Sequence, residues 1–188
     1  MYATSRYGVP PAQCRGIRGA AAATLHVSEG RQFVWAGAVW SGNAALPSSA
    51  LDGLLEIKPG EIADLSRIQN GIRAIHHEYG RHGYVFESAS YTPQLDDATR
   101  RATFQFTVNE DAQYTMGTLQ FVGIRAADAD KLQKQWHLKQ CDAFDLDELE
   151  KYQKDVLDRL QSPSGQRPVI QMAFDRDHHV ANLRVELK

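Results

Sequence analysis

An internal repeat constrains the fold of this chain more than any other feature of its sequence. Gln32-Phe33 is matched by Gln113-Tyr114, an offset of 81 residues (113 − 32). A repeat of this length is the signature of a supersecondary module that recurs along the chain. The same offset relates further pairs in both copies: Trp40 and Phe121, Gly42 and Gly123, Leu55 and Trp136, Ile57 and Leu138, Asp64-Leu65 and Asp145-Leu146, Phe104 and Val185, Phe106 and Leu187.

The first copy contains one long amphipathic helix whose start and end are both marked. Asp64 precedes the helix and suits the N-cap, where a carboxylate accepts hydrogen bonds from unpaired backbone N–H groups. Gly80 and Gly83 suit its end, because glycine adopts the positive φ that stops a helix. Apolar residues at spacings of 3 or 4 place one face against a sheet: Leu65, Ile68, Ile72, Ile75 and Tyr79.

The remaining elements of each copy follow from alternation and turn residues. Arg101–Val108 alternates strictly and predicts a strand with one covered face. Both copies then have the order β-α-α-β-β. The other expected elements of the first copy are a strand over Phe33–Trp40 with a bulge near Gly37, a short helix that opens at Pro47, and a strand over Tyr84–Tyr91; those of the second are strands over Tyr114–Phe121, Val169–Phe174 and Val180–Leu187 and helices over Asp128–Leu138 and Leu146–Leu160.

The repeat also divides the chain. Ala23, Leu25 and Val27 precede Phe104, Phe106 and Val108 by the same 81 residues, so the start of the chain corresponds to the end of a unit. We therefore expect the C-terminal remnant of a preceding unit over residues 1–31, one complete unit over 32–111 and another over 112–188. Too few residues separate the complete units for a free linker.

Composition and charge argue against several classes of function. A formal net charge of −2 among 188 residues gives no large basic surface for nucleic acid or anionic membrane. No apolar run reaches the length of a membrane helix, and the N-terminus has no signal-peptide core. The protein is then either cytosolic or a piece of something longer. Cys14 and Cys141 are expected to be free thiols rather than a disulfide framework, although a disulfide between them stays open.

The sequence contains no strong catalytic or metal motif. His77 and His82 are five residues apart, whereas a helical zinc motif needs a spacing of 4 to place both rings on one face. His76, His77 and His82 are therefore read as surface residues, and His178-His179 as turn residues. We expect no catalytic residue, no cofactor and no metal. The three tryptophans, Trp35, Trp40 and Trp136, are read as core residues.

These features resemble POTRA domains, the polypeptide-transport-associated repeats that precede the barrel in outer-membrane assembly proteins of the BamA and TamA type. The resemblance rests on the ends of the first strands (Trp40-Ser41-Gly42 and Phe121-Val122-Gly123), a turn at Gly60, the corner Tyr79…Gly83-Tyr84, and the joint Val108-Asn109-Glu110. It implies an α+β fold of tandem modules, each a three-stranded mixed sheet covered on one face by two helices. Trp40, Gly42, Gly60, Gly83, Phe121 and Gly123 become structural markers, and Glu110, Gln113 and Tyr114 the joint between units.

The resemblance also implies a function: a non-catalytic periplasmic scaffold that binds unfolded outer-membrane protein segments and accessory lipoproteins or chaperones, next to a C-terminal membrane β-barrel. The physical route is β-augmentation, in which an extended peptide adds to a free sheet edge. The expected edges are Tyr84–Tyr91 and Val169–Phe174, unless a neighbouring unit covers them. The candidate contact residues are Tyr84, Phe86, Ser88, Ser90, Val169, Gln171 and Ala173.

Two other function classes stay open at this level. The first is an architectural protein, of the divisome type for example, whose POTRA-like units only position partners. The second is a small metal-dependent enzyme built on an α+β repeat.

Overall fold

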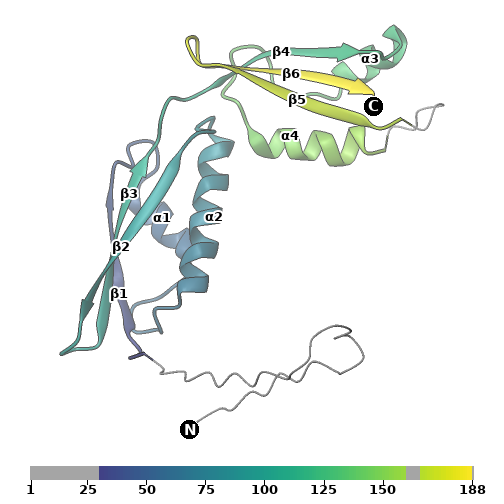
Figure 1. Ribbon diagram of the computed structural model, residues 1–188. Helices are drawn as coiled ribbons and strands as arrows, with labels where there is room; N and C mark the ends of the chain where they lie inside the picture. Colours follow the sequence, from purple (N-terminus) through teal and green to yellow (C-terminus); the bar gives the residue numbers. More distant parts are fainter. Residues whose placement is uncertain (1–29, 160–165, 188) are drawn as a thin grey trace, which may run out of the picture. The chain divides into compact units, whose positions relative to one another are not determined.

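The computed structural model describes residues 30–159 and 166–187. The chain divides into two units, residues 1–31 and 32–188, and all the described helices and strands lie in the second. The predicted remnant over residues 1–31 falls almost wholly outside the described residues. Figure 1 shows the elements in chain order: β1 (Val34–Ser41), α1 (Ser48–Leu55), α2 (Leu65–Arg81), β2 (Ser88–Asp96), β3 (Arg101–Asn109), β4 (Thr115–Val122), α3 (Ala126–Gln133), α4 (Leu146–Tyr152), β5 (Pro168–Asp175) and β6 (Val180–Leu187).

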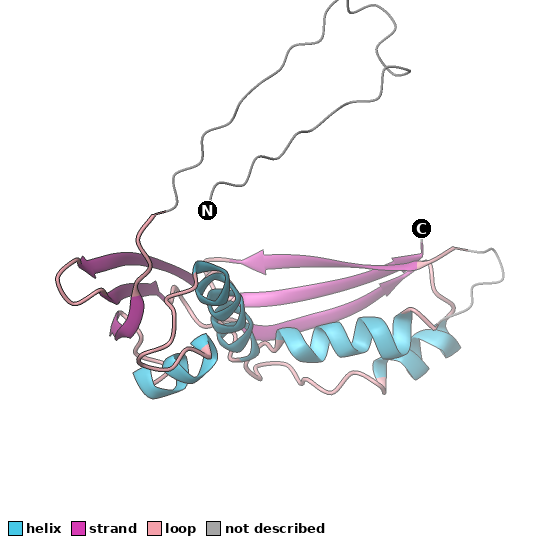
Figure 2. Cartoon of the chain, turned by 90° about the horizontal axis from the view of Figure 1, so that it is seen from below, coloured by secondary structure: helices cyan, strands magenta, loops and turns pink. Residues whose placement is uncertain are grey.

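The described residues form two three-stranded mixed sheets, each with two helices on one face. The first has the order β1-β3-β2 and the second β4-β6-β5. In each sheet the first strand runs parallel to the central one and the hairpin partner runs antiparallel. Figures 1 and 2 show that helices cover a single face of each sheet. The predicted fold class is confirmed. We call β1–β3 with α1 and α2 the first module, and β4–β6 with α3 and α4 the second.

Helix α2 forms where the sequence predicts it. The Asp64 carboxylate accepts a hydrogen bond from Ser66 N at 2.8 Å, which caps the helix. Ile68, Ile75 and Tyr79 are fully buried on its inner face. Leu65, in contrast, is 53% exposed. In the described part of the chain no helix is long and apolar enough to cross a membrane.

Each module has its own apolar core. In the first, Phe104 and Phe106 on β3 stack against Trp35 and Trp40 on β1, with ring centroids 5.0 and 4.3 Å apart. In the second, Leu183 and Val185 of β6 take these positions, and Phe174 makes aromatic contacts with Tyr114 and Phe144 instead. Trp35 and Trp136 are core residues as expected, 3% and 7% exposed, whereas Trp40 is only partly buried and packs against the first core.

The offset of 81 residues holds for the first strands and for the starts of α2 and α4, but not for the closing strands. Trp40 pairs with Phe106, and its counterpart Phe121 pairs with Val185. Phe106 therefore corresponds to Val185, an offset of 79 (185 − 106), and the predicted match with Leu187 is wrong. The second module is two residues shorter between its first and last strands.

Three predicted elements have bounds that differ from the observed ones by more than one residue. The strand expected over Tyr84–Tyr91 begins four residues later, at Ser88, and continues to Asp96. Helix α3 ends at Gln133 rather than Leu138. The final helix of the second module changes to a π-helical turn over Gln153–Leu157. The predicted domain boundary between residues 111 and 112 falls in the segment that joins β3 to β4 and stays a prediction.

Candidate functional site

Each sheet has two edges, and the chain itself covers part of one of them. The turn before α2 runs along β1: Trp35 N donates to Glu61 O at 2.7 Å, and Ala63 N donates to Phe33 O at 3.0 Å. The same arrangement covers the start of β4, where Met116 N donates to Asp142 O at 2.8 Å. Among the described elements, β2 and β5 pair only with the central strand of their own sheet. They are therefore the sheet edges that an added strand can reach.

The edge of the first module differs from the one predicted. Tyr84 and Phe86 precede β2 in an irregular turn and are not part of the edge. The prediction is wrong for these two residues because their aromatic rings pack into cores instead: Tyr84 contacts Tyr79 at 5.8 Å between ring centroids, and Phe86 contacts the second module. Ser88 and Ser90 do lie on the strand and are exposed.

The strand β2 also contains Pro93, which the predicted range excluded. Proline has no N–H and is tolerated in a sheet only on an edge strand, where its nitrogen need not pair with the neighbour. β2 is an edge strand of its sheet, so Pro93, which pairs with Phe104, is consistent with this rule. A peptide that adds to β2 finds no donor at Pro93, so this edge is blunted.

The edge of the second module contains all three residues predicted for it. Val169, Gln171 and Ala173 lie on β5 and are exposed, and Gln171 Nε2 donates to Glu186 Oε1 at 2.9 Å. Val169 is 37% and Met172 48% exposed. The strand has no lysine or arginine, and its only proline is the first residue, Pro168. The edge of β5 is therefore not blunted as β2 is.

The two edges can be compared residue by residue. Phe104 and Leu183 are equivalent, because Ala38 pairs with the first and its counterpart Leu119 with the second. Pro93 pairs with Phe104, and Met172 pairs with Leu183. Met172 therefore stands in the second module where the first has Pro93, and the two edges differ by one backbone donor at this position.

The predicted joint residues act in two ways. Tyr114 N donates to Gly83 O at 2.8 Å, and Gln113 Nε2 donates to His82 O at 2.9 Å, so these two bind the corner at the end of α2. Glu110 instead stays within the first module. Its Oε1 accepts from Tyr79 Oη and from Ala45 N, each at 2.8 Å. Burial is the main cause that raises the pKa of Tyr79, and the bond to Glu110 adds to it.

An aromatic cluster that the sequence did not predict completes the joint. Phe86 lies edge-on to Tyr114 and Phe174, with ring centroids 5.3 and 5.0 Å away, and the Arg176 guanidinium lies 4.6 Å from the centroid of the Phe86 ring. Tyr114 is only 2% exposed. Edge-to-face rings and a cation over a ring each add to the stability of such a contact. Phe86 is thus a joint residue rather than an edge residue.

Charged groups beside the cluster add a second set of contacts. His77 Nε2 lies 2.8 Å from Asp147 Oδ1, and Arg81 Nε lies 3.1 Å from Asp147 Oδ2. Glu87 contacts His76, and its side chain is 1% exposed with Oε1 unpaired among the described residues. Burial raises the pKa of Glu87, the contact with His76 opposes this, and the charge of Glu110 adds to it.

The structural markers mostly serve turns and cores. Trp40 donates from Nε1 to Asp52 Oδ1 at 2.8 Å, and Gly60 N donates to Trp35 O at 2.9 Å. Gly83, at φ +84°, lies so close to the second module that a Cβ would be 2.5 Å from Tyr114 O. The remaining three markers are Phe121, packed against the second core, and Gly42 and Gly123, both with positive φ.

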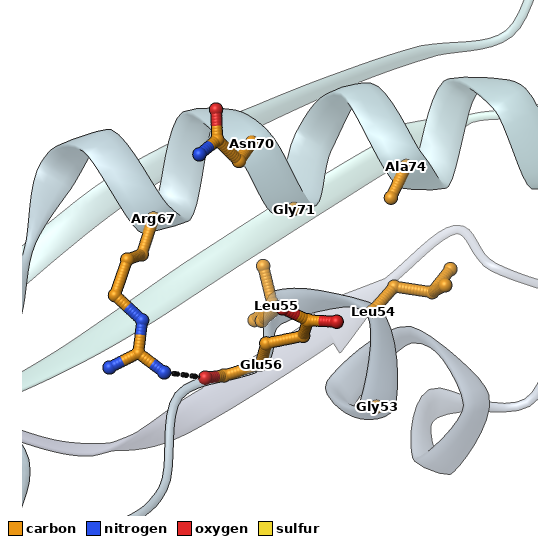
Figure 3. Close-up of a pocket in the computed structure, with 8 residues that line it drawn as sticks. All are labelled: Gly53, Leu54, Leu55, Glu56, Arg67, Asn70, Gly71 and Ala74. Carbon is orange, nitrogen blue, oxygen red and sulfur yellow. Dashed lines mark hydrogen bonds between the residues drawn. The ribbon is translucent and has the colours of Figure 1, made fainter.

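A cleft of about 220 Å³ lies between the end of α1 and α2 (Figure 3). Arg67 reaches across its mouth to the carbonyl oxygen of Glu56 and also pairs with Glu61 at 2.8 Å. Gly71 allows the helices to approach, since a Cβ there would lie 2.8 Å from Leu55 Cα. Arg67, the side chain of the cleft that could bind an anion, is thus already paired with Glu56 O and Glu61. We therefore interpret the cleft as a feature of the packing between α1 and α2.

The histidines form no metal site in the described residues. No group of three or more His, Cys, Asp or Glu side chains is placed to hold a metal ion in residues 30–159 and 166–187. His178 instead closes the β5–β6 turn by bonding Asp175 at 2.8 Å, which lowers the pKa of that carboxyl. Cys141 is a free, exposed thiol, and Cys14 lies outside the described residues.

Solved structures share this arrangement of two modules. The POTRA3–5 fragment of Haemophilus influenzae BamA matches with a TM-score of 0.63 and 18% identity over 84% of this chain and 66% of the fragment. BamA from Haemophilus ducreyi lacking POTRA domains 1–3 matches with a TM-score of 0.65 and 11% identity, over 84% of this chain and 29% of that one. POTRA1–2 of Omp85 from Anabaena matches with a TM-score of 0.52 and 16% identity, over 84% and 96%. These similarities define the fold class.

A comparison of sequence agrees with the fold. Residues 35–111 match the family model POTRA, described as the surface antigen variable number repeat. The matched segment contains nearly all of the first module, and the second module has the same fold. The resemblance predicted from the sequence is confirmed. The chain spans 66% of the first of these structures and 29% of the second, so it corresponds to part of such proteins.

Proposed function

We propose that this chain is a non-catalytic scaffold of an outer-membrane protein assembly or secretion protein, that it lies in the periplasm, and that it binds extended segments of substrate proteins. The POTRA match of residues 35–111 supports the class. Unfolded outer-membrane protein strands, accessory lipoproteins or chaperones, and a membrane barrel in the same protein are the partners that this class implies. The division into units at residues 31/32 and 111/112 is part of the proposal.

The free edge of strand β5 is the main support for the binding proposal. Among the described residues β5 pairs with β6 alone; it contains no lysine or arginine and exposes Val169 and Met172. An edge of this kind offers main-chain groups to an added strand and apolar contacts to alternate side chains. We propose β5 as the principal edge, because Pro93 removes a donor from the corresponding place on β2.

A peptide titration tests the proposal. A peptide of about ten residues, the length of a membrane-spanning strand, with alternating apolar and polar residues is added to the ¹⁵N-labelled protein. The expected result is that amide signals shift along Val169–Phe174 and little along β2. Signals of β5 that do not move at saturating peptide would contradict the proposal.

Met172→Pro is the matched control. The first module already carries proline at this register position, so the variant is expected to fold with an intact sheet. It lacks one main-chain donor and carries a ring at the edge, so peptide affinity should fall about ten-fold, the equivalent of about 1.4 kcal/mol. A variant that binds as tightly as the parent would show that the peptide does not add to this edge.

The architectural alternative predicts a different result in the same titration. A protein that only positions partners gives no shift with strand peptides, and Met172→Pro has no effect. The enzyme alternative requires a stoichiometric metal in the purified protein, and metal analysis tests it directly.

A further inference from the structure

The second sheet carries a groove beside the proposed binding edge. The groove has a volume of about 530 Å³ and is lined by residues of β4, β6 and β5. Helices cover a single face of this sheet, and Leu183 and Val185 are buried against them, so Arg184 between them lies on the open face (Figure 2). Among the described residues that line the groove, Arg184 is the one cation and there is no acid. An added strand on β5 would therefore lie next to a positively charged groove.

Arg184 has unused hydrogen-bond donors. A guanidinium carries five N–H groups. The side chain is 50% exposed, and its ion pair within the described residues is with Glu186, whose Oε2 lies 3.6 Å from Nη2. This distance is too long for a hydrogen bond. Gln171 holds Glu186 from the neighbouring strand, because its Nε2 donates to Oε1 at 2.9 Å. The guanidinium can therefore bind a second carboxylate.

Asn182 adds neutral donors to the same groove. Its Oδ1 accepts from Thr118 N and from Thr118 Oγ1, each at 2.9 Å. Gly117 makes room for the amide, because a Cβ there would lie 2.4 Å from this oxygen. Both bonds use the oxygen and fix the orientation of the amide. The two N–H donors of Nδ2 are left for a ligand, in a groove that Arg184 also lines.

The edge residue next to these groups is small. Ala173 of β5 is in register with Asn182. By the offset of 79 in the closing strands, its equivalent in the first module is Gln94 (173 − 94), and the equivalent of Arg184 is Gln105 (184 − 105). A side chain that reaches inward from a strand on β5 passes over an alanine and meets a cation. One that reaches inward from a strand on β2 meets a longer side chain and no charge at these positions.

The groups in the groove define the chemistry of the side chain that they would bind. Arginine binds a carboxylate through two parallel N–H···O bonds, which are about twice as strong as bonds between neutral groups. A hydroxyl or amide side chain would gain less, and a lysine would face a like charge. An acidic side chain therefore fits the groove best.

We infer that the β5 edge prefers strands that carry an acidic side chain on the face toward the groove, and that Arg184 and Asn182 bind its carboxylate across Ala173. The main chain of the added strand supplies most of the affinity, and the carboxylate supplies the preference. This inference rests on the proposed function, because the strand must first add to β5.

Two peptides that differ in one side chain test the inference. Both have about ten residues with the same alternating sequence, and the central polar position is glutamate in one and glutamine in the other. Their ends are acetylated and amidated, so no terminal carboxylate competes. Affinities from the amide shifts of Val169–Phe174 should favour the glutamate peptide about five-fold at low salt and less in about 0.5 M salt. The side-chain Nε signal of Arg184 should shift with the glutamate peptide and not with the glutamine peptide.

Arg184→Gln is the test variant, and Arg101→Gln is its charge-matched control. The first sheet folds with Gln105 at the position equivalent to Arg184, so the test variant is expected to keep an intact sheet. Arg101 is exposed on β3 of the first module, outside the groove. The ratio of the two peptide affinities should fall to about one in Arg184→Gln and stay near about five in Arg101→Gln.

Equal affinity of the parent protein for the two peptides overturns the inference but leaves the proposed function intact, provided that β5 signals move. A preference that survives in Arg184→Gln overturns it as well. A preference lost equally in Arg101→Gln also overturns it, because net charge rather than the groove would then be the cause. If neither peptide moves the signals of Val169–Phe174, the proposed function fails and this inference fails with it.

Discussion

The first and second modules have the same topology but use their edges and ends differently. The edge of β2 carries Pro93 where β5 has Met172. Leu65 and Leu95 are exposed at one end of the first module. At the corresponding end of the second module, Phe174 packs against three aromatic rings. A repeat therefore preserves the residues that make the sheet and the helix cap, and varies those that decide what the module contacts.

A second contrast concerns the glycine that ends the first strand. Gly42 and Gly123 both have positive φ, +81° and +73°. A Cβ at Gly42 would lie 2.0 Å from Val108 O, but one at Gly123 would meet nothing within 4 Å. The same glycine therefore serves a close backbone approach in one module and only a turn conformation in the other.

The largest effect is expected for Gly42→Ala. The substitution combines backbone strain with a clash against a carbonyl oxygen that cannot rotate away, so unfolding should become easier by at least about 3 kcal/mol. Gly123→Ala has the strain alone and should cost about 1 kcal/mol. Urea unfolding followed by tryptophan fluorescence measures both. Equal costs for the two variants would remove this contrast.

The next effect separates the covered end from the exposed one. Phe174→Ala removes a ring that contacts Phe86, Tyr114 and Phe144, and should cost about 2–3 kcal/mol. Leu95→Ala at the corresponding position should cost less than about 1 kcal/mol in this chain, because the side chain is 56% exposed. The free energies of unfolding of the two variants test this. A larger cost for Leu95→Ala would show that the Leu95 side chain is already covered.

The smallest effect is a pH dependence at the joint. Burial raises the pKa of Glu87, so this acid holds its proton more tightly in the folded protein than in the unfolded chain. Its contribution to stability is full below the ordinary value of 4.5 and is lost as pH rises through the raised pKa. His76, Glu110 and Tyr79 face it, and only His76 opposes the shift. Relative to the parent, Glu87→Gln should therefore gain stability as pH rises from 4.5 toward neutrality.

Glu61→Gln is the control of opposite sign. Hydrogen bonds from Lys58 N and Arg67 lower the pKa of Glu61, so its contribution is present above the ordinary value of 4.5 and is lost as pH falls through the lowered pKa. Unfolding is measured from about pH 2 to about pH 8. Relative to the parent, Glu61→Gln should lose stability as pH rises toward 4.5, and Glu87→Gln should gain stability as pH rises above it. Parallel profiles would contradict the assignment of Glu87 as a buried acid.

The sequence predicts the fold because its signals are local. Asp64 before an apolar helical face and the strict alternation of Arg101–Val108 depend on neighbouring residues alone, and both elements lie where they were expected. The repeat then extends these assignments to the second copy. Gln113 and Tyr114 come from the family resemblance rather than from such signals, and in the structure both hydrogen-bond to the corner at the end of α2.

The site was predicted less well, because it depends on contacts between distant residues. Tyr84-Val85-Phe86 has the composition of a strand, but Phe86 gains more by packing between Tyr114 and Phe174 than by extending β2. Pro93 suggests the end of a strand until its place on a free edge is known. Only the pairing of β2 with β3 gives that information.

The central claim is that one backbone donor decides which edge accepts a strand, and a reciprocal exchange tests it most directly. In the double variant Pro93→Met with Met172→Pro, each module carries the other's edge residue. Titration with the strand peptide should now shift amide signals along Ser88–Asp96 and no longer along Val169–Phe174. Shifts that stay on Val169–Phe174 with unchanged affinity would contradict the account.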